Sequence, residues 1–78
     1  MRIRVKLFAT LSRLANVPSG TPLDIDLPEE AAVGDLLDRL GLPRHEVRVV
    51  FVNGRARPND WPLRPGDEVG IFPPIGGG

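Results

Sequence analysis

The sequence has no cysteine and only one histidine, His45. Without cysteine the chain forms no disulfide, no thiolate-bound zinc or iron–sulfur site and no catalytic thiol. One histidine alone makes no metal site, so we expect no bound metal. Ten acidic side chains balance ten basic ones, and the positive excess typical of nucleic-acid binding is therefore missing. We expect no nucleic-acid partner.

Long apolar runs are missing too, since no stretch approaches the roughly 18 residues of a membrane span. The first residues alternate charged and bulky side chains and lack the apolar stretch of a signal peptide. These two absences predict a cytoplasmic protein with no membrane partner.

The chain has 78 residues, which is enough for one domain at most. A domain this small buries only about 60% of the surface of its unfolded chain. Because that leaves little room for an enclosed active site beside a core, we expect a carrier, an inhibitor or a binding module. We do not expect an enzyme with catalytic side chains of its own.

Four segments have the alternation, or the β-branched and aromatic composition, of strands: residues 2–9, 23–27, 48–52 and 68–72. The first two are separated by a Pro-Ser-Gly turn signal and are expected to pair antiparallel. An Asn-Gly turn follows the third, and the Pro-Gly pair before the fourth fits a type II turn. Residues 11–15 predict a short helix or turn, and the proline-containing segment 55–63 is predicted to be irregular.

One amphipathic helix is predicted between the second and third strands. Four apolar residues recur at the spacing of a single helix face: Val33, Leu36, Leu37 and Leu40. Gly41 is well placed to end this helix. Ala32 is a poor N-cap, so we expect the start of the helix to be its weak end.

This order of elements predicts an α+β fold of the β-grasp (ubiquitin-like) type. We expect a mixed sheet of four to five strands, one main helix packed across one face, and a flexible C-terminal glycine tail. By analogy with that fold, the first and last strands lie side by side and parallel at the sheet centre. The domain is predicted to span residues 1–75 and the tail residues 76–78. The predicted core is Ile3, Val5, Leu7, Leu36, Leu37, Leu40, Val69 and Ile71.

Three glycines, Gly76, Gly77 and Gly78, end the sequence. With glycine near 7% of residues, three in a row at the end arise by chance in only about 0.03% of sequences. A frayed tail is the plain alternative, and composition alone does not decide between the two. The context of the glycines carries the argument further.

Residues 63–78 resemble the end of the MoaD/ThiS family of sulfur carriers, where a Gly-Asp-Glu-Val turn and strand precede a proline-containing tail and Gly-Gly. The Phe72-Pro73-Pro74 step resembles the MoaD branch, the small subunit of molybdopterin synthase. Leu7-Phe8-Ala9 resembles the start of that branch, and Val52-Asn53-Gly54 the middle strand and turn of the family. The resemblance covers the whole chain.

The resemblance implies that the working group is the C-terminal carboxylate of Gly78. A terminal carboxyl has a pKa near 3.5, so it is an anion at neutral pH. A separate ubiquitin-activating-type adenylating enzyme would join it to AMP with Mg-ATP, and a persulfide sulfur would then leave a thiocarboxylate. The chain itself would bind no cofactor. Gly76 and Gly77 lack a Cβ and can thread a narrow channel.

Several recipients of the sulfur stay open. The MoaD branch implies transfer to a pterin precursor in molybdenum or tungsten cofactor synthesis, with the molybdopterin synthase large subunit as acceptor enzyme. Sulfur transfer for thiamin or for tRNA thiolation, and use as a ubiquitin-like protein modifier, are the alternatives. A second alternative is a β-grasp interaction module that carries no sulfur.

Strand parity predicts where partners dock. If Val5 and Leu7 point inward, Phe8 points outward, and the same reasoning turns Phe72 outward in the last strand. Phe51 joins them if Val50 and Val52 are inward. We expect the three rings to form a docking surface for both partner enzymes on the helix-free face. Cover by the irregular segment is the plain alternative.

The remaining conspicuous residues are expected to be structural. Arg2, Arg4 and Lys6 form a basic outer row that we interpret as a solvated face, with a partner's acidic patch as the alternative. The carboxylates around Asp24 are interpreted as a solvated strand edge. Trp61 is expected to pack its own irregular segment against the domain, with a partner anchor as the alternative.

Overall fold

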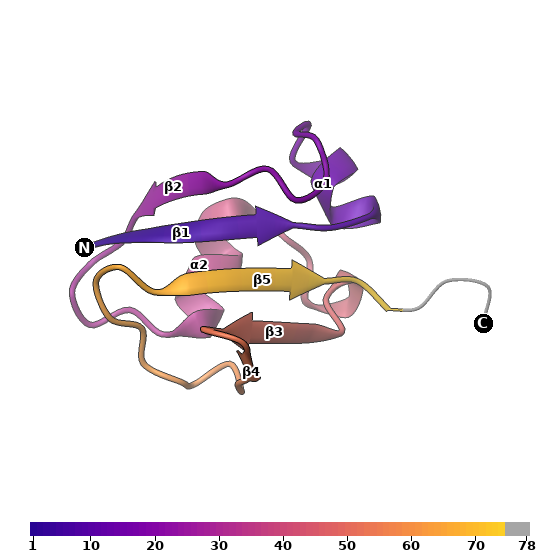
Figure 1. Ribbon diagram of the computed structural model, residues 1–78. Helices are drawn as coiled ribbons and strands as arrows, with labels where there is room; N and C mark the ends of the chain where they lie inside the picture. Colours follow the sequence, from indigo (N-terminus) through magenta and orange to yellow (C-terminus); the bar gives the residue numbers. More distant parts are fainter. Residues whose placement is uncertain (75–78) are drawn as a thin grey trace.

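The computed structural model describes residues 1–74, whose five strands form one mixed sheet in the order β2-β1-β5-β3-β4 (Figure 1). The strands β1 and β5 are parallel neighbours at the centre, and the other neighbouring strands are antiparallel. The predicted β-grasp arrangement is therefore confirmed. The elements are β1 Arg2–Leu7, α1 Thr10–Leu14, β2 Leu23–Asp26, α2 Val33–Leu40, η1 Arg44–Glu46, β3 Val49–Val52, β4 Arg55–Ala56 and β5 Glu68–Phe72.

The core lies between the sheet and α2, which covers one face of it (Figure 1). Seven of the eight predicted core residues are buried; Leu40, at the last position of α2, is only half-buried. Residues outside the predicted set complete the core: Leu11, Leu27, Ala31, Val33, Leu42, Val50, Val52 and Leu63. In the part of the chain that the structure describes, no helix has the length and apolar character needed to cross a membrane.

The first backbone amides of α2 have hydrogen-bond acceptors even though the N-cap residue is Ala32. Alanine has no side-chain acceptor, but the Val33 and Gly34 amides donate to the carbonyls of Trp61 and Asn59 at 3.0 and 2.8 Å. The Ala32 amide in turn donates to the Asp35 carboxylate at 2.8 Å. The expectation of a weak helix start is therefore wrong, because a distant segment supplies the acceptors that the cap lacks.

The segment between β3 and β5 is largely irregular, as predicted. The Asn53-Gly54 turn forms a two-residue hairpin loop with positive φ at both residues and leads into the short edge strand β4. Trp61 is half-buried against the core, and the Arg57 guanidinium lies 3.9 Å from its ring centroid. This packing confirms that Trp61 holds its own segment down.

The charged rows of β1 and β2 face each other across the antiparallel pair. Arg2 donates to Asp26 at 3.1 Å, and Arg4 lies 3.9 Å from Asp24. The hydrogen bond lowers the pKa of the Asp26 carboxyl and raises that of the Arg2 guanidinium. Arg2 and Arg4 therefore lie beside opposite charges on an exposed surface, whereas Lys6, the third residue of the predicted basic row, has no ion pair within residues 1–74.

Candidate functional site

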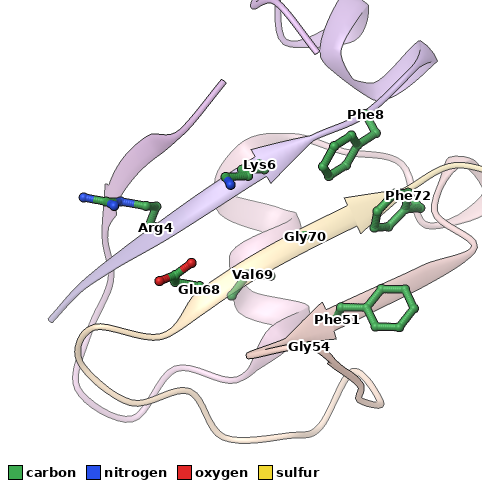
Figure 2. Close-up of a pocket in the computed structure, with 9 residues that line it drawn as sticks. All are labelled: Arg4, Lys6, Phe8, Phe51, Gly54, Glu68, Val69, Gly70 and Phe72. Carbon is green, nitrogen blue, oxygen red and sulfur yellow. The ribbon is translucent and has the colours of Figure 1, made fainter. Parts of the chain in front are cut away.

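The three phenylalanines meet on the sheet face that α2 leaves uncovered (Figure 2). The rings of Phe8 and Phe72 stack with centroids 4.3 Å apart and an interplanar angle of 3°. Phe51 meets Phe72 edge-on, with centroids 5.6 Å apart. All three side chains are half-buried. The predicted parity is confirmed, and we call Phe8, Phe51 and Phe72 the aromatic patch.

Gly70 forms the floor of a hollow beside the aromatic patch. A Cβ built on Gly70 would lie 3.4 Å from a Phe72 ring carbon and 3.6 Å from a Phe8 ring carbon. A pocket of about 270 Å³ opens over Gly70, bounded by the patch at one end and by Arg4, Lys6 and Glu68 towards the other (Figure 2). This volume is ample for one large apolar side chain of a partner.

The turn after β1 fixes the position of Phe8. Ala9 has φ 51° and ψ −126°, a conformation that residues with a Cβ rarely adopt. The Leu11 amide donates to the Phe8 carbonyl at 3.1 Å, and the Ser12 hydroxyl donates to the Ala9 carbonyl at 2.7 Å. The Phe8 ring also lies beside Gly20, since a Cβ added to Gly20 would lie 3.5 Å from a carbon of the ring. The strained turn at Ala9 therefore holds the Phe8 ring in place.

The turn before β5 anchors the start of the strand that carries Phe72. The Asp67 carboxylate accepts from the Arg64 amide at 2.8 Å and from the Asn53 side chain at 3.0 Å. Asn53 accepts in turn from the Glu68 amide at 3.0 Å. Gly66 has φ 83°, as the predicted type II turn requires. These bonds tie the start of β5 to the β3–β4 turn, a pairing that no local sequence signal reveals.

The described chain leaves the sheet beside the aromatic patch. The Phe72 carbonyl still accepts from the Arg48 amide at 2.8 Å, and Pro73 then ends the ladder because it has no amide hydrogen. The predicted glycine tail, Gly76 to Gly78, and the domain boundary at residue 75 lie outside the described residues. Four residues after Pro74 reach at most about 14 Å when extended.

A metal-binding cluster is absent from residues 1–74. No group of three or more His, Cys, Asp or Glu side chains there is arranged to hold a metal ion. His45 is exposed beside Glu46, with 3.5 Å between its Nε2 and the carboxylate. The aromatic patch is the candidate site because three aromatic rings gather there around one apolar hollow.

Comparisons with known proteins agree with this geometry. The ThiS family model matches residues 5–78. A "Putative molybdopterin converting factor, subunit 1" from Pyrococcus furiosus is 34% identical, covering 96% of this chain and 99% of that chain, with a TM-score of 0.78. Small archaeal modifier protein 1 from Haloferax volcanii is 29% identical, covering 95% of this chain and 98% of that chain, with a TM-score of 0.77.

A ubiquitin from Caldiarchaeum subterraneum is 21% identical, covering 100% of this chain and 98% of that chain, with a TM-score of 0.62. At that identity the likeness supports the fold alone. A comparison with curated protein sequences gives no match.

Proposed function

The chain belongs to the ThiS family of small ubiquitin-like sulfur carriers and modifiers, and we propose that its reactive group is the carboxylate of Gly78. Proteins of this family are carriers and not catalysts. The observation that supports the proposal is the family match itself, which runs from β1 through the three glycines at the end of the sequence.

The proposed reaction begins with the Gly78 carboxylate, which attacks the α-phosphate of ATP and releases pyrophosphate. A ubiquitin-activating-type enzyme binds the Mg-ATP and performs this step. A persulfide sulfur then attacks the acyl carbon, AMP leaves, and reduction of the resulting acyl disulfide by a thiol leaves a thiocarboxylate. The carrier contributes no acid or base, and its folded domain only positions the tail.

Docking through the aromatic patch supplies the binding energy that the tail lacks. Ordering a glycine costs about 1–2 kcal/mol and buries almost no apolar area. Complete burial of an exposed phenylalanine contributes about 1.5–3 kcal/mol, and each of these half-buried rings would contribute roughly half of that when a partner covers it. Because Phe72 directly precedes Pro73-Pro74, a partner seated on the patch lies at the base of the tail. We propose that the activating enzyme and the acceptor enzyme bind this same surface in turn.

The acceptor that we propose is the large subunit of molybdopterin synthase, which would pass the sulfur to a pterin precursor of the molybdenum or tungsten cofactor. Its support is the Phe72-Pro73-Pro74 step and the name of the Pyrococcus furiosus protein. Attachment to protein lysines is the second candidate, favoured by the likeness to small archaeal modifier protein 1. No observation favours thiamin synthesis or tRNA thiolation.

The test is to incubate the chain with its activating enzyme, Mg-ATP and a persulfide donor, and to measure the intact mass. The expected product has one oxygen replaced by sulfur. Adding one residue after Gly78, or deleting Gly77 and Gly78, should leave the domain folded and abolish pyrophosphate release. Activation of either variant would overturn the assignment of Gly78.

The acceptor is tested separately with the thiocarboxylate form. Transfer of sulfur to a pterin precursor in the presence of the synthase large subunit supports the first candidate. Isopeptide-linked conjugates on other proteins, identified by peptide mapping in cells, support the second. If a fully activated carrier gives neither product, both candidate functions are contradicted.

A further inference from the structure

The chain has a single side-chain amine. Lys6 is its only lysine, and the other nine basic residues are arginines. Arginine guanidinium groups stay protonated in proteins and do not act as nucleophiles towards activated carboxyl groups. The α-amino group of Met1 donates to the Leu27 carbonyl at 2.6 Å and lies 3.5 Å from the Glu29 carboxylate. This amine is therefore held by a hydrogen bond and an ion pair in the folded domain.

Lys6 lies in the hollow of the aromatic patch. It stands in register with Gly70 across the β1–β5 pair and lines the same pocket as Phe8 and Phe72 (Figure 2). The side chain is half-buried. Within residues 1–74 it has no ion pair, whereas the nearby Arg4 lies close to a carboxylate of β2.

We propose that Lys6 is the one side chain of this protein that accepts an activated carboxyl group, and that a partner docked on the aromatic patch closes this site. The acyl donor would be an acyl adenylate, in the first instance that of a second copy of the chain. The inference rests on the proposed function, because it takes the patch as the docking surface and Gly78 as the activated end.

The reaction balances without an oxidant or a reductant. A lysine amine that has lost its proton attacks the acyl carbon of the adenylate with its nitrogen lone pair. A C–N bond forms, the C–O bond to the phosphate of AMP breaks, and AMP leaves with the electron pair. The second proton of the nitrogen goes to solvent, and an isopeptide bond remains.

The location of Lys6 makes acylation and docking exclude each other. A partner side chain that enters the hollow over Gly70 covers the amine, so an engaged carrier is protected from the activated carboxyl groups that its own pathway produces. An acyl group on Lys6 would conversely occupy the hollow and block the partner. A free, activated carrier in excess over its partners is the state in which Lys6 reacts.

The first test labels the folded chain with an N-hydroxysuccinimide ester of acetic acid, a small amine-reactive probe, and maps the adducts by peptide mass spectrometry. We expect labelling at Lys6 in the free chain. With the activating enzyme present at about ten times its dissociation constant, labelling at Lys6 should fall about tenfold. The matched control is Arg39→Lys on α2, at an exposed position across the sheet from the patch. Labelling at this control position should not change.

The second test uses the activating enzyme and Mg-ATP with no acceptor and a molar excess of carrier. An isopeptide-linked dimer joined at Lys6 is expected, and Lys6→Arg should abolish it. An unreactive Lys6 in the free chain, or equal labelling with and without the enzyme, would overturn the inference. Failure of the proposed function gives a different result, namely no release of pyrophosphate. In that case the labelling test remains valid with any partner that binds the aromatic patch.

Discussion

Gly70→Val is the change that best separates docking from folding. Gly70 lies in β5 and is not among the glycines with positive φ, so a side chain is compatible with its backbone. The new Cβ would meet Phe72 and Phe8 at 3.4 and 3.6 Å, which is ordinary contact distance. The strand gains a β-branched residue and the rings shift slightly. We expect the free energy of unfolding to change by no more than about 1 kcal/mol.

The effect on binding should be larger, because the two methyl groups of valine must occupy the hollow of about 270 Å³ or displace the rings that bound it. A partner side chain of leucine or phenylalanine size that no longer enters loses about 1.5–3 kcal/mol, which corresponds to a roughly tenfold to hundredfold higher dissociation constant. Both partner enzymes should lose affinity if they share the site.

The assay is calorimetric titration of the activating enzyme and of the acceptor enzyme with wild type, Gly70→Ala and Gly70→Val. The alanine variant is the matched control, since its single methyl group fits beneath the rings. Urea unfolding of all three chains measures their stability. If Gly70→Val binds both enzymes as tightly as the wild type does, the hollow is not the docking site and the reasoning fails.

Four further changes test other parts of the structure. Phe72→Ala should weaken both complexes about tenfold or more on a folded domain, because it removes the ring that contacts the other two; unchanged calorimetric affinities would contradict this. Leu37→Ala, at a 1% exposed position, should lower the unfolding free energy by about 2–5 kcal/mol in urea, and a loss below about 1 kcal/mol would show that the site collapses freely. Ala9→Gly should raise the melting temperature, since glycine adopts φ 51° without strain; a lower value would refute the strained turn. Asp26→Asn should cost a little stability at neutral pH that salt reduces, because the bond from Arg2 lowers the pKa of Asp26. The difference from wild type should vanish as the pH falls through that lowered pKa, below about pH 4, and a difference that persists there would exclude this cause.

The sequence predicts the fold of this chain well because its periodicities are clean. The apolar stripe from Val33 to Leu40 matches the bounds of α2, and alternation in β1 and β5 assigns both faces of the sheet. Parity alone therefore places Phe8 and Phe72 on the same face. The residue classes that set the period are also those that bury area, so local pattern and tertiary packing agree.

The parts that the sequence does not predict depend on contacts between distant segments. Nothing local in residues 58–62 indicates that their carbonyls accept from the first amides of α2. The hydrogen bond between Asp67 and Asn53 joins residues fourteen apart in sequence. Strand parity turns the rings outward, but the stacking of Phe8 on Phe72 depends on the register of β1 against β5 and on the missing side chain of Gly70.

The central place of β5 also constrains how the chain is made. This strand is the last described element, yet it lies between β1 and β3 and hydrogen-bonds to both. Until the ribosome has released residues 68–72, β1 and β3 expose unpaired strand edges, which are templates for aggregation. Closure of the sheet must therefore follow the synthesis of β5, and the long-range pairing of β1 with β5 makes folding slower than that of a helical domain of this size. A ribosome that stops before β5 leaves a chain that cannot close its sheet, so only a chain that has been translated through β5 can present the aromatic patch.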